Sequence, residues 1–97
     1  MAAYIVVDTV IQDETEMERY KTRAKPLVER FGGRYLARGG HLVVKERKLW
    51  SPTRIVLLRF DSVKQAEDFY ESAEYQELLP VSQKAADRTF LIVEGIE

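Results

Sequence analysis

Four consecutive aliphatic residues in the middle of the chain, Ile55 to Leu58, most constrain what this sequence can fold into. The stretch 54–60 around them lies between Pro52 and a helix-start signal at Ser62, and it has apolar side chains at both alternating positions. Such a strand is typical of the middle of a sheet, where both faces are covered. Because a chain of 97 residues has only two other segments able to form covering helices, we expect a second copy to cover one face.

The sequence up to Gly32 predicts one strand and one helix. Residues 4–11 are mainly apolar at both parities, which is typical of a second inner strand. Asp13 followed by Glu16 has the capping pattern of a helix start, and apolar residues then recur at steps of three and four. Gly32 is placed to end that helix, and Pro26 removes one of its backbone hydrogen bonds, so we expect a kink.

Glycines interrupt the stretch that follows. Residues 33–45 predict a long second strand, in which Gly39 and Gly40 mark a bulge or a close approach of the backbone. Residues 45–53 hold charged and hydroxyl groups together with Trp50, so we expect a loop or an outward-projecting strand end there.

The remaining sequence predicts a second helix, a short helical turn and a last strand. Ser62 with Gln65 three residues later forms a second capping box, and apolar residues follow at helical spacing. A helical turn over 74–79 is expected to continue this helix until Pro80 stops it. Residues 89–94 are apolar at both parities and predict the last strand.

The order strand, helix, strand, strand, helix, strand predicts a single ferredoxin-like domain over residues 1–97. With right-handed crossovers, this order gives an antiparallel four-stranded α+β sandwich with two helices on one face. The helix-free face would carry large apolar side chains, and burying each of them is worth about 1.5 to 3 kcal/mol. We therefore expect two sheets to pack face to face in a homodimer, the arrangement called a dimeric α+β barrel.

Composition excludes several classes of function. The net charge of -1 comes from 15 basic and 16 acidic residues interspersed along the chain, so a nucleic-acid partner is not expected. The absence of cysteine excludes thiolate-bound metals, and the single histidine excludes a multi-histidine metal site. The N-terminal apolar run is too short for a signal peptide or a membrane span. We expect a cytoplasmic protein with no membrane partner and no cofactor.

Several motifs agree in order and spacing with one bacterial family. They are Gly32 to Gly40, Trp50 to Arg54, Phe60 to Ser62, Phe69 and Tyr70 with Ser72 and Tyr75, and Val93 to Gly95. On these motifs the chain resembles the family called domain of unknown function 1330 over almost its whole length. The resemblance implies a ferredoxin-like fold of the dimeric α+β barrel superfamily, which also holds cofactor-independent monooxygenases, polyketide cyclases, haem-degrading enzymes and stress-response domains.

The resemblance implies no particular reaction, and the chain departs from the family pattern at two positions. Ser82 stands where an arginine is common, and Arg59 stands where an acidic residue is common. A charged site shared by the family is therefore not carried over to these positions.

Some candidate functional residues gather around the double glycine. His41 follows Gly39 and Gly40, where it could transfer a proton, with Arg38 as a charged clamp for a carboxylate or carbonyl oxygen. The simpler interpretations, a hydrogen-bonded or exposed histidine and a bulge that bends the strand, are favoured. Trp50 is interpreted as a loop lid or a dimer contact.

Other candidates are tyrosines on the expected helices. Tyr20, Tyr70 and Tyr75 fall on or beside apolar stripes, so core packing is the default, with hydroxyls turned toward a rim. If a pocket lies between helices and sheet, these hydroxyls together with Arg54 or Arg38 suit an aromatic or keto-acid-like ligand.

Two classes of function remain open. The first is a cofactor-independent enzyme acting on a small aromatic or keto-acid-like molecule, in which Tyr20, Arg38 or His41 handles a proton or an oxyanion. Its candidate substrate-binding residues are Gly39, Gly40, Trp50, Arg54, Tyr70 and Tyr75. The second is a non-catalytic homodimeric module that binds a metabolite or serves as an interaction domain.

Overall fold

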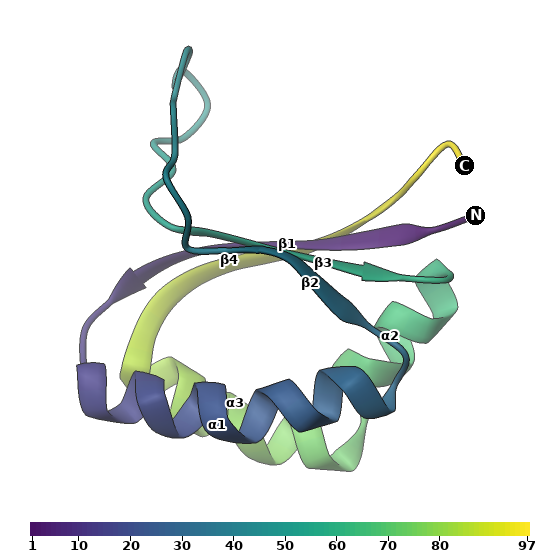
Figure 1. Cartoon of the computed structure of the whole chain (residues 1–97). Coiled ribbons are helices and arrows are strands. Elements are labelled where there is room, and N and C mark those ends of the chain that lie inside the picture. The colour runs from purple at the N-terminus through teal and green to yellow at the C-terminus, as the bar shows by residue number, and fades with distance from the viewer.

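The structure of the protein is a computed structural model that describes residues 1–97. It holds a four-stranded antiparallel sheet with strand order β2-β3-β1-β4, and its three helices cover one face of that sheet (Figure 1). This is the ferredoxin-like arrangement that the sequence predicts, with one helix more than expected. In chain order the elements are β1 Ala3–Ile11, α1 Glu14–Arg30, β2 Arg34–Arg38, β3 Ile55–Phe60, α2 Val63–Glu71, α3 Ala73–Ala85 and β4 Ala86–Glu94.

The aliphatic run of β3 lies inside the sheet, as the sequence predicts. β3 pairs with β2 on one side and with β1 on the other, while β4 pairs with the second edge of β1. Ile5 of β1 lies opposite Leu58 of β3 and Ile92 of β4; Ile5 and Leu58 belong to the core beneath the helices, and Ile92 packs against it. This inner row positions the helix layer, because burying each large aliphatic side chain contributes about 1.5 to 3 kcal/mol.

Both ends of α1 follow from the sequence. Asp13 Oδ1 accepts a hydrogen bond from the Glu16 N–H at 3.1 Å, which satisfies one of the free donors of the first turn. Just past the other end, Gly32 takes a φ of 83° and its N–H donates to the Glu29 carbonyl at 3.0 Å. Pro26 lies inside the helix, where the buried face formed by its neighbours outweighs the missing hydrogen bond.

The expectation of a short helical turn that ends at Pro80 was wrong. α3 is a separate helix of 13 residues that continues past Pro80 to Ala85. Ser72 starts it by accepting a hydrogen bond from the Tyr75 N–H at 3.1 Å. Pro80 removes one backbone hydrogen bond, but Leu78, Ser82 and Ala85 on the inner face are buried, so packing of that face decides the helix length. The sheet consequently carries three helices rather than two.

The expectation of a long second strand over 33–45 was also wrong. β2 ends at Arg38, and its one irregularity lies between Tyr35 and Ala37 rather than at Gly39 and Gly40. Gly39 instead takes a φ of 70°, which turns the chain out of the sheet.

Residues 39–54 form one long loop that rises on the side of the sheet away from the helices (Figure 1). Most of its side chains are exposed, including Leu49 at 94%. A loop of only a few residues is enough to connect two neighbouring antiparallel strands such as β2 and β3. The loop is therefore an addition to the sheet and extends the molecule on its helix-free side.

The helix-free side of the sheet, which we call the open face, is rich in apolar side chains. Val10 of β1 and Leu91 and Val93 of β4 are exposed there, and alternation places Val6 and Leu57 on the same face. An apolar face of this extent is typical of a surface that another protein covers. No helix of the chain is both long and apolar enough to cross a membrane.

Candidate functional site

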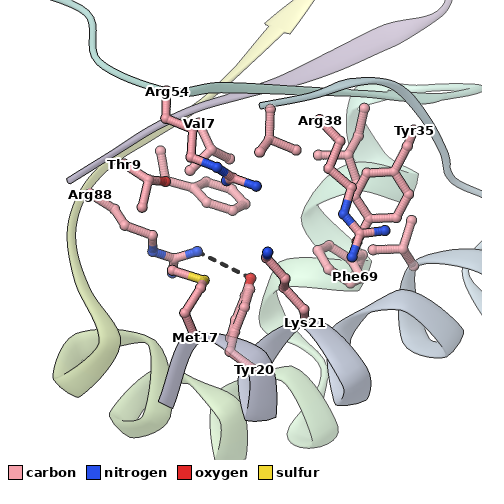
Figure 2. A pocket seen from close by; sticks show the side chains of 14 residues that line it. Val7, Thr9, Met17, Tyr20, Lys21, Tyr35, Arg38, Arg54, Phe69 and Arg88 are labelled. Atoms are coloured by element: carbon pink, nitrogen blue, oxygen red, sulfur yellow. Dashed lines mark hydrogen bonds between the residues drawn. The ribbon is translucent and has the colours of Figure 1, made fainter. Parts of the chain in front are cut away.

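A cavity lies between α1 and the helix-facing side of the sheet (Figure 2). The cavity has a volume of about 50 Å³, and it opens to the solvent. This is room enough for water and lies below the usual range of small-molecule sites, so a ligand held there would extend outward from the cavity. The lining comes from all four strands, α1, α2 and the end of the long loop: Val7, Thr9, Met17, Tyr20, Lys21, Val28, Tyr35, Arg38, Arg54, Val56, Leu58, Phe69, Arg88 and Phe90.

The charged part of the lining is entirely positive. Arg38, Arg54, Arg88 and Lys21 contribute to the wall, and no aspartate, glutamate or histidine does. Of these four cations only Lys21 has an ion pair, with Glu18 at 3.3 Å. No group of three acidic or histidine side chains lies together anywhere in the chain, so no metal-ligand set is formed. An apolar cavity with several unpaired cations attracts an anion.

Arg88 of β4 is held at one end of the cavity by three uncharged oxygens. Its Nη1 donates to the Tyr20 hydroxyl at 3.1 Å, and its Nη2 donates to the hydroxyls of Tyr75 and Ser82 at 3.2 and 3.1 Å. Burial lowers the pKa of Arg88, but the tyrosine oxygens outweigh this effect and leave the pKa above its ordinary value. The guanidinium is therefore a half-buried cation that no carboxylate in the chain balances.

The two tyrosines beside Arg88 form a hydrogen-bonded pair. The hydroxyls of Tyr20 and Tyr75 lie 2.8 Å apart, and their rings meet edge to face with centroids 6.3 Å apart. Tyr75 is fully buried, and this burial is the main reason why its pKa is raised well above the ordinary value. Tyr75 consequently keeps its proton at any physiological pH.

Arg54 enters the cavity from the end of the long loop. Its guanidinium lies directly over Gly39, where a Cβ atom would stand only 2.7 Å from Arg54 Nε. The Gly39 N–H donates to the Ile55 carbonyl at 2.9 Å, which joins the two ends of the loop at this point. Two features therefore require a glycine at this position: the left-handed φ of the backbone, and the guanidinium of Arg54, which occupies the place of a Cβ atom.

Asp8 fixes the returning end of the loop from the open face. Its Oδ1 accepts from the backbone N–H groups of Thr53 and Arg54, each at 2.9 Å, and its Oδ2 accepts from Trp50 Nε1 at 2.8 Å. Burial raises the pKa of Asp8, but these hydrogen bonds outweigh it and leave the pKa below its usual value. Asp8 is thus a loop anchor and does not line the cavity.

The β2 side of the cavity is formed by a stacked pair. The Arg38 guanidinium lies 4.8 Å from the centroid of the Tyr35 ring, and both residues line the cavity. Burial, more than any charge nearby, raises the pKa of Tyr35 to about 12. The phenol is neutral at physiological pH and adds a polar edge to the wall without adding negative charge.

The structure brings together part of the predicted site. Tyr20, Arg38 and Arg54 line the cavity, although they come from three segments far apart in the sequence. Gly39 lies beneath Arg54, and Tyr75 lies behind Tyr20, so both touch the site through another residue.

Other predicted site residues lie outside the cavity lining. His41 and Gly40 belong to the exposed loop, and Trp50 binds Asp8 on the open face. Tyr70 packs its ring between Tyr75 and Phe90 in the core. A catalytic role for His41 stays a prediction, and the structure does not bring it into the cavity.

Sequence reasoning missed Arg88 and Lys21. The last strand was expected to begin at Thr89, whereas β4 begins at Ala86 and carries Arg88 on the same face as Phe90. Extending the strand by alternation would have shown an arginine on the helix-facing side, which is an unusual position for an unpaired cation. Lys21 follows Tyr20 on α1 and lies outside the apolar stripe of that helix. Its position in the sequence therefore did not indicate that it lines a cavity.

The fold and the cavity place the chain among small ferredoxin-like α+β domains. The sequence matches the model of the family described as Domain of unknown function (DUF1330) over residues 2–96, and the chain belongs to that family. A comparison with curated proteins gives no match.

Solved structures with low sequence identity share the fold. A protein of unknown function from Rhodopseudomonas palustris has a TM-score of 0.77 and 14% identity, over 99% of this chain and 83% of its own. A dimeric protein of unknown function with a ferredoxin-like fold, from Bacteroides fragilis, has a TM-score of 0.62 and 13% identity, over 97% and 96%. A candidate antibiotic biosynthesis monooxygenase from Nitrosomonas europaea has a TM-score of 0.56 and 20% identity, over 98% and 89%.

Proposed function

We propose that the protein binds a small organic anion, an aromatic or keto acid, in the cavity between α1 and the sheet. The observation that carries this proposal is the unbalanced charge of the wall, which holds three arginines and a lysine but no acidic side chain. A buried or half-buried cation without a counter-charge is costly, and an anionic ligand would remove that cost.

The shape of the charge distribution defines the ligand class further. Arg88 comes from β4 at one edge of the sheet and Arg38 from β2 at the other, and Figure 2 shows the Arg54 side chain between them, with Val7 and other apolar side chains completing the wall. A ligand with a flat apolar body and one or two oxygen-rich ends satisfies both parts of this wall. Benzoate and phenylglyoxylate have this character, and benzamide is a neutral counterpart of benzoate.

Isothermal titration calorimetry with these three compounds tests the proposal. We expect the two acids to bind and benzamide to bind at least about tenfold more weakly, because the charge-assisted hydrogen bonds are lost. Replacing Arg54 by Met, which retains an apolar stem of similar length, should weaken both acids and leave benzamide nearly unchanged. If neither acid binds, or if benzamide binds as tightly as benzoate, the cavity is not an anion site.

Catalysis by a cofactor-independent enzyme is the second candidate function. The Tyr20 hydroxyl, which accepts a hydrogen bond from Arg88 at the cavity wall, favours it because such a group stabilises a developing oxyanion. The Nitrosomonas europaea relative, which is a candidate monooxygenase, shares only the fold with this chain. Against catalysis by proton abstraction, the lining holds no carboxylate or histidine to serve as an ordinary general base.

Exchange of substrate protons separates the enzyme from the binding module. Pyruvate is incubated with the protein in deuterated water, and loss of its methyl proton signal is followed by NMR. Faster exchange than in buffer, abolished by replacing Tyr20 with Phe, would support an enzyme that stabilises an enolate. An unchanged exchange rate together with acid binding would support the non-catalytic module.

We further propose that two chains pair through their open faces. The apolar side chains of Val10, Leu91 and Val93 support this pairing, because they would be exposed to solvent in a monomer. The Bacteroides fragilis relative of the same fold is dimeric, which makes the same arrangement reasonable here. Light scattering should give a mass of twice 11.3 kDa, and Leu91→Glu should reduce it to a single chain. A monomeric mass for the unaltered protein would contradict the pairing.

A further inference from the structure

The protons shared by Tyr20 and Tyr75 can be assigned by counting donors and acceptors. The hydroxyl of Tyr75 is fully buried and has two hydrogen-bond partners, the Tyr20 hydroxyl and Arg88 Nη2. A guanidinium donates and cannot accept. The Tyr75 hydrogen must therefore point to the Tyr20 oxygen, which fixes the direction of the bond between the two phenols.

The same count fixes the hydrogens of Arg88. The Ser82 hydroxyl gives its own hydrogen to the Leu79 carbonyl at 2.7 Å, so it accepts from Arg88 Nη2. Both hydrogens on Nη2 are then used, by Tyr75 and by Ser82, and one hydrogen on Nη1 is used by Tyr20. Of the five N–H groups of Arg88, the one on Nε and the second on Nη1 have no acceptor in the protein.

Tyr20 is left with a free hydrogen at the cavity wall. Its oxygen accepts from both Tyr75 and Arg88, and its own O–H has no acceptor within the chain. Thr9 lines the cavity beside it, is only 3% exposed, and its hydroxyl also makes no hydrogen bond within the chain. The Arg88 end of the cavity therefore presents several donors and no charged acceptor, which is the chemistry of a carboxylate site.

We infer that the carboxylate of the ligand binds at the Arg88 end and accepts a hydrogen bond from the Tyr20 hydroxyl, with Tyr75 as a positioning residue behind Tyr20. An O–H group becomes a stronger donor when its oxygen accepts hydrogen bonds, so Tyr75 and Arg88 together strengthen the bond from Tyr20. The inference rests on the proposed binding of an organic acid and deepens it, because it states which end of the cavity takes the carboxylate.

Calorimetry with benzoate and benzamide on three tyrosine variants tests the inference. Tyr20→Phe should weaken benzoate roughly 10- to 100-fold, the effect of one lost hydrogen bond to a charged group, and should weaken benzamide much less. Tyr75→Phe should weaken benzoate by about two- to fivefold, since it removes only the strengthening of the Tyr20 donor. Tyr70→Phe is the matched control, because its hydroxyl makes no hydrogen bond and does not line the cavity.

Selectivity between the two probes separates this role from a structural one. A general loosening of the core would weaken benzoate and benzamide alike, whereas loss of the donor chain lowers the ratio of their affinities. Equal benzoate affinity in the unaltered protein and in Tyr20→Phe would overturn the inference while leaving the anion site intact. Failure of the unaltered protein to bind either acid would overturn both the site and the inference.

A measurement without ligand covers the case in which Tyr75→Phe does not fold. A buried hydroxyl hydrogen that is held by an acceptor exchanges slowly enough with water to be seen by NMR. We expect such a signal from Tyr75 in the unaltered protein, and we expect Tyr20→Phe to remove it, because the acceptor is lost. Persistence of the signal in Tyr20→Phe would show that Tyr75 donates elsewhere and would overturn the proton assignment.

Discussion

The two ends of the cavity hold their arginines in different ways. Arg88 is fixed by side chains of α1 and α3, and its three hydrogen bonds come from Tyr20, Tyr75 and Ser82 in the packed helix layer. Arg54 lies at the end of a long loop, where its backbone N–H donates to Asp8. Its guanidinium packs against Gly39, which has no side chain to displace it. The first end is built into the core and the second depends on the loop.

This difference teaches that one cavity can combine a rigid subsite with an adjustable one. Residues buried among helices become exposed only when much of the fold unfolds, whereas a loop held by few contacts can unfold locally. We therefore expect changes at the Arg88 end to act mainly on binding, and changes at the loop end to act on binding and local order together.

Replacing Arg88 by Met is expected to give the largest effect on binding. It removes the cation nearest the proposed carboxylate, so affinity for benzoate should fall by about 100-fold, measured by calorimetry. Tyr75 can still donate to Tyr20, and Ser82 to Leu79, so no buried donor is left without a partner.

The stability of the Arg88→Met variant sharpens the comparison. Since a half-buried cation without a counter-charge carries a desolvation penalty, the free energy of unfolding should change by less than about 1 kcal/mol or increase. Urea denaturation measures it. A loss of several kcal/mol would mean that Arg88 is chiefly a structural residue, and the anion site would lose its strongest support.

Replacing Gly39 by Ala is expected to give the next largest effect, at the loop end. The φ of 70° strains any other residue, and the new Cβ would stand 2.7 Å from Arg54 Nε. We expect a loss of about 1 to 3 kcal/mol in unfolding free energy and a several-fold weaker affinity for benzoate as Arg54 is displaced. Urea denaturation and calorimetry measure the two quantities.

The neighbouring glycine provides the matched control. Gly40 has no atom within 4 Å of the position of a Cβ, and its φ is not positive. Gly40→Ala should therefore leave stability and benzoate affinity unchanged. If both alanine variants behave alike, the particular geometry of Gly39 and Arg54 is not what shapes this end of the cavity.

Replacing Asp8 by Asn is expected to have a smaller effect, because it weakens an anchor outside the cavity. The carboxylate accepts the Thr53 and Arg54 N–H groups on one oxygen and the Trp50 Nε1–H on the other. Asparagine has only one accepting oxygen, so it cannot accept all three hydrogen bonds in this way. Amide hydrogen exchange should become faster in residues 50–54, and benzoate affinity should fall by about two- to threefold.

The pH dependence of the same loop follows from the lowered pKa of Asp8. A carboxyl group with a lower pKa in the folded state stabilises that state above its unfolded pKa, and the stabilisation is lost as pH falls through the folded value. Protection in residues 50–54, the slowing of exchange relative to an unfolded chain at the same pH, should thus be constant near neutrality and should decrease as the pH falls from about 3.8, the ordinary value for aspartate, through the lower folded value. The Asp8→Asn variant should show no such step.

The sequence predicted the sheet better than the segments that build the site. Strands such as 54–60 and helix starts such as Asp13 carry strong local signals, and the structure confirms them. Pro80 and Gly39 were misjudged because tertiary packing decides whether a helix passes a proline and whether a glycine marks a bulge or a strand end. Arg88 was missed for the same reason, since its three partners lie on other elements.

Replacing His41 by Ala is expected to have the smallest effect of all. His41 lies in the exposed loop beyond Gly39 and does not line the cavity, so neither end of the cavity depends on its side chain. Benzoate affinity and stability should stay within error of the unaltered protein, measured by calorimetry and urea denaturation. A tenfold loss of affinity would mean that the loop folds back over the cavity when ligand binds, and the loop end would then be a moving lid rather than an adjustable wall.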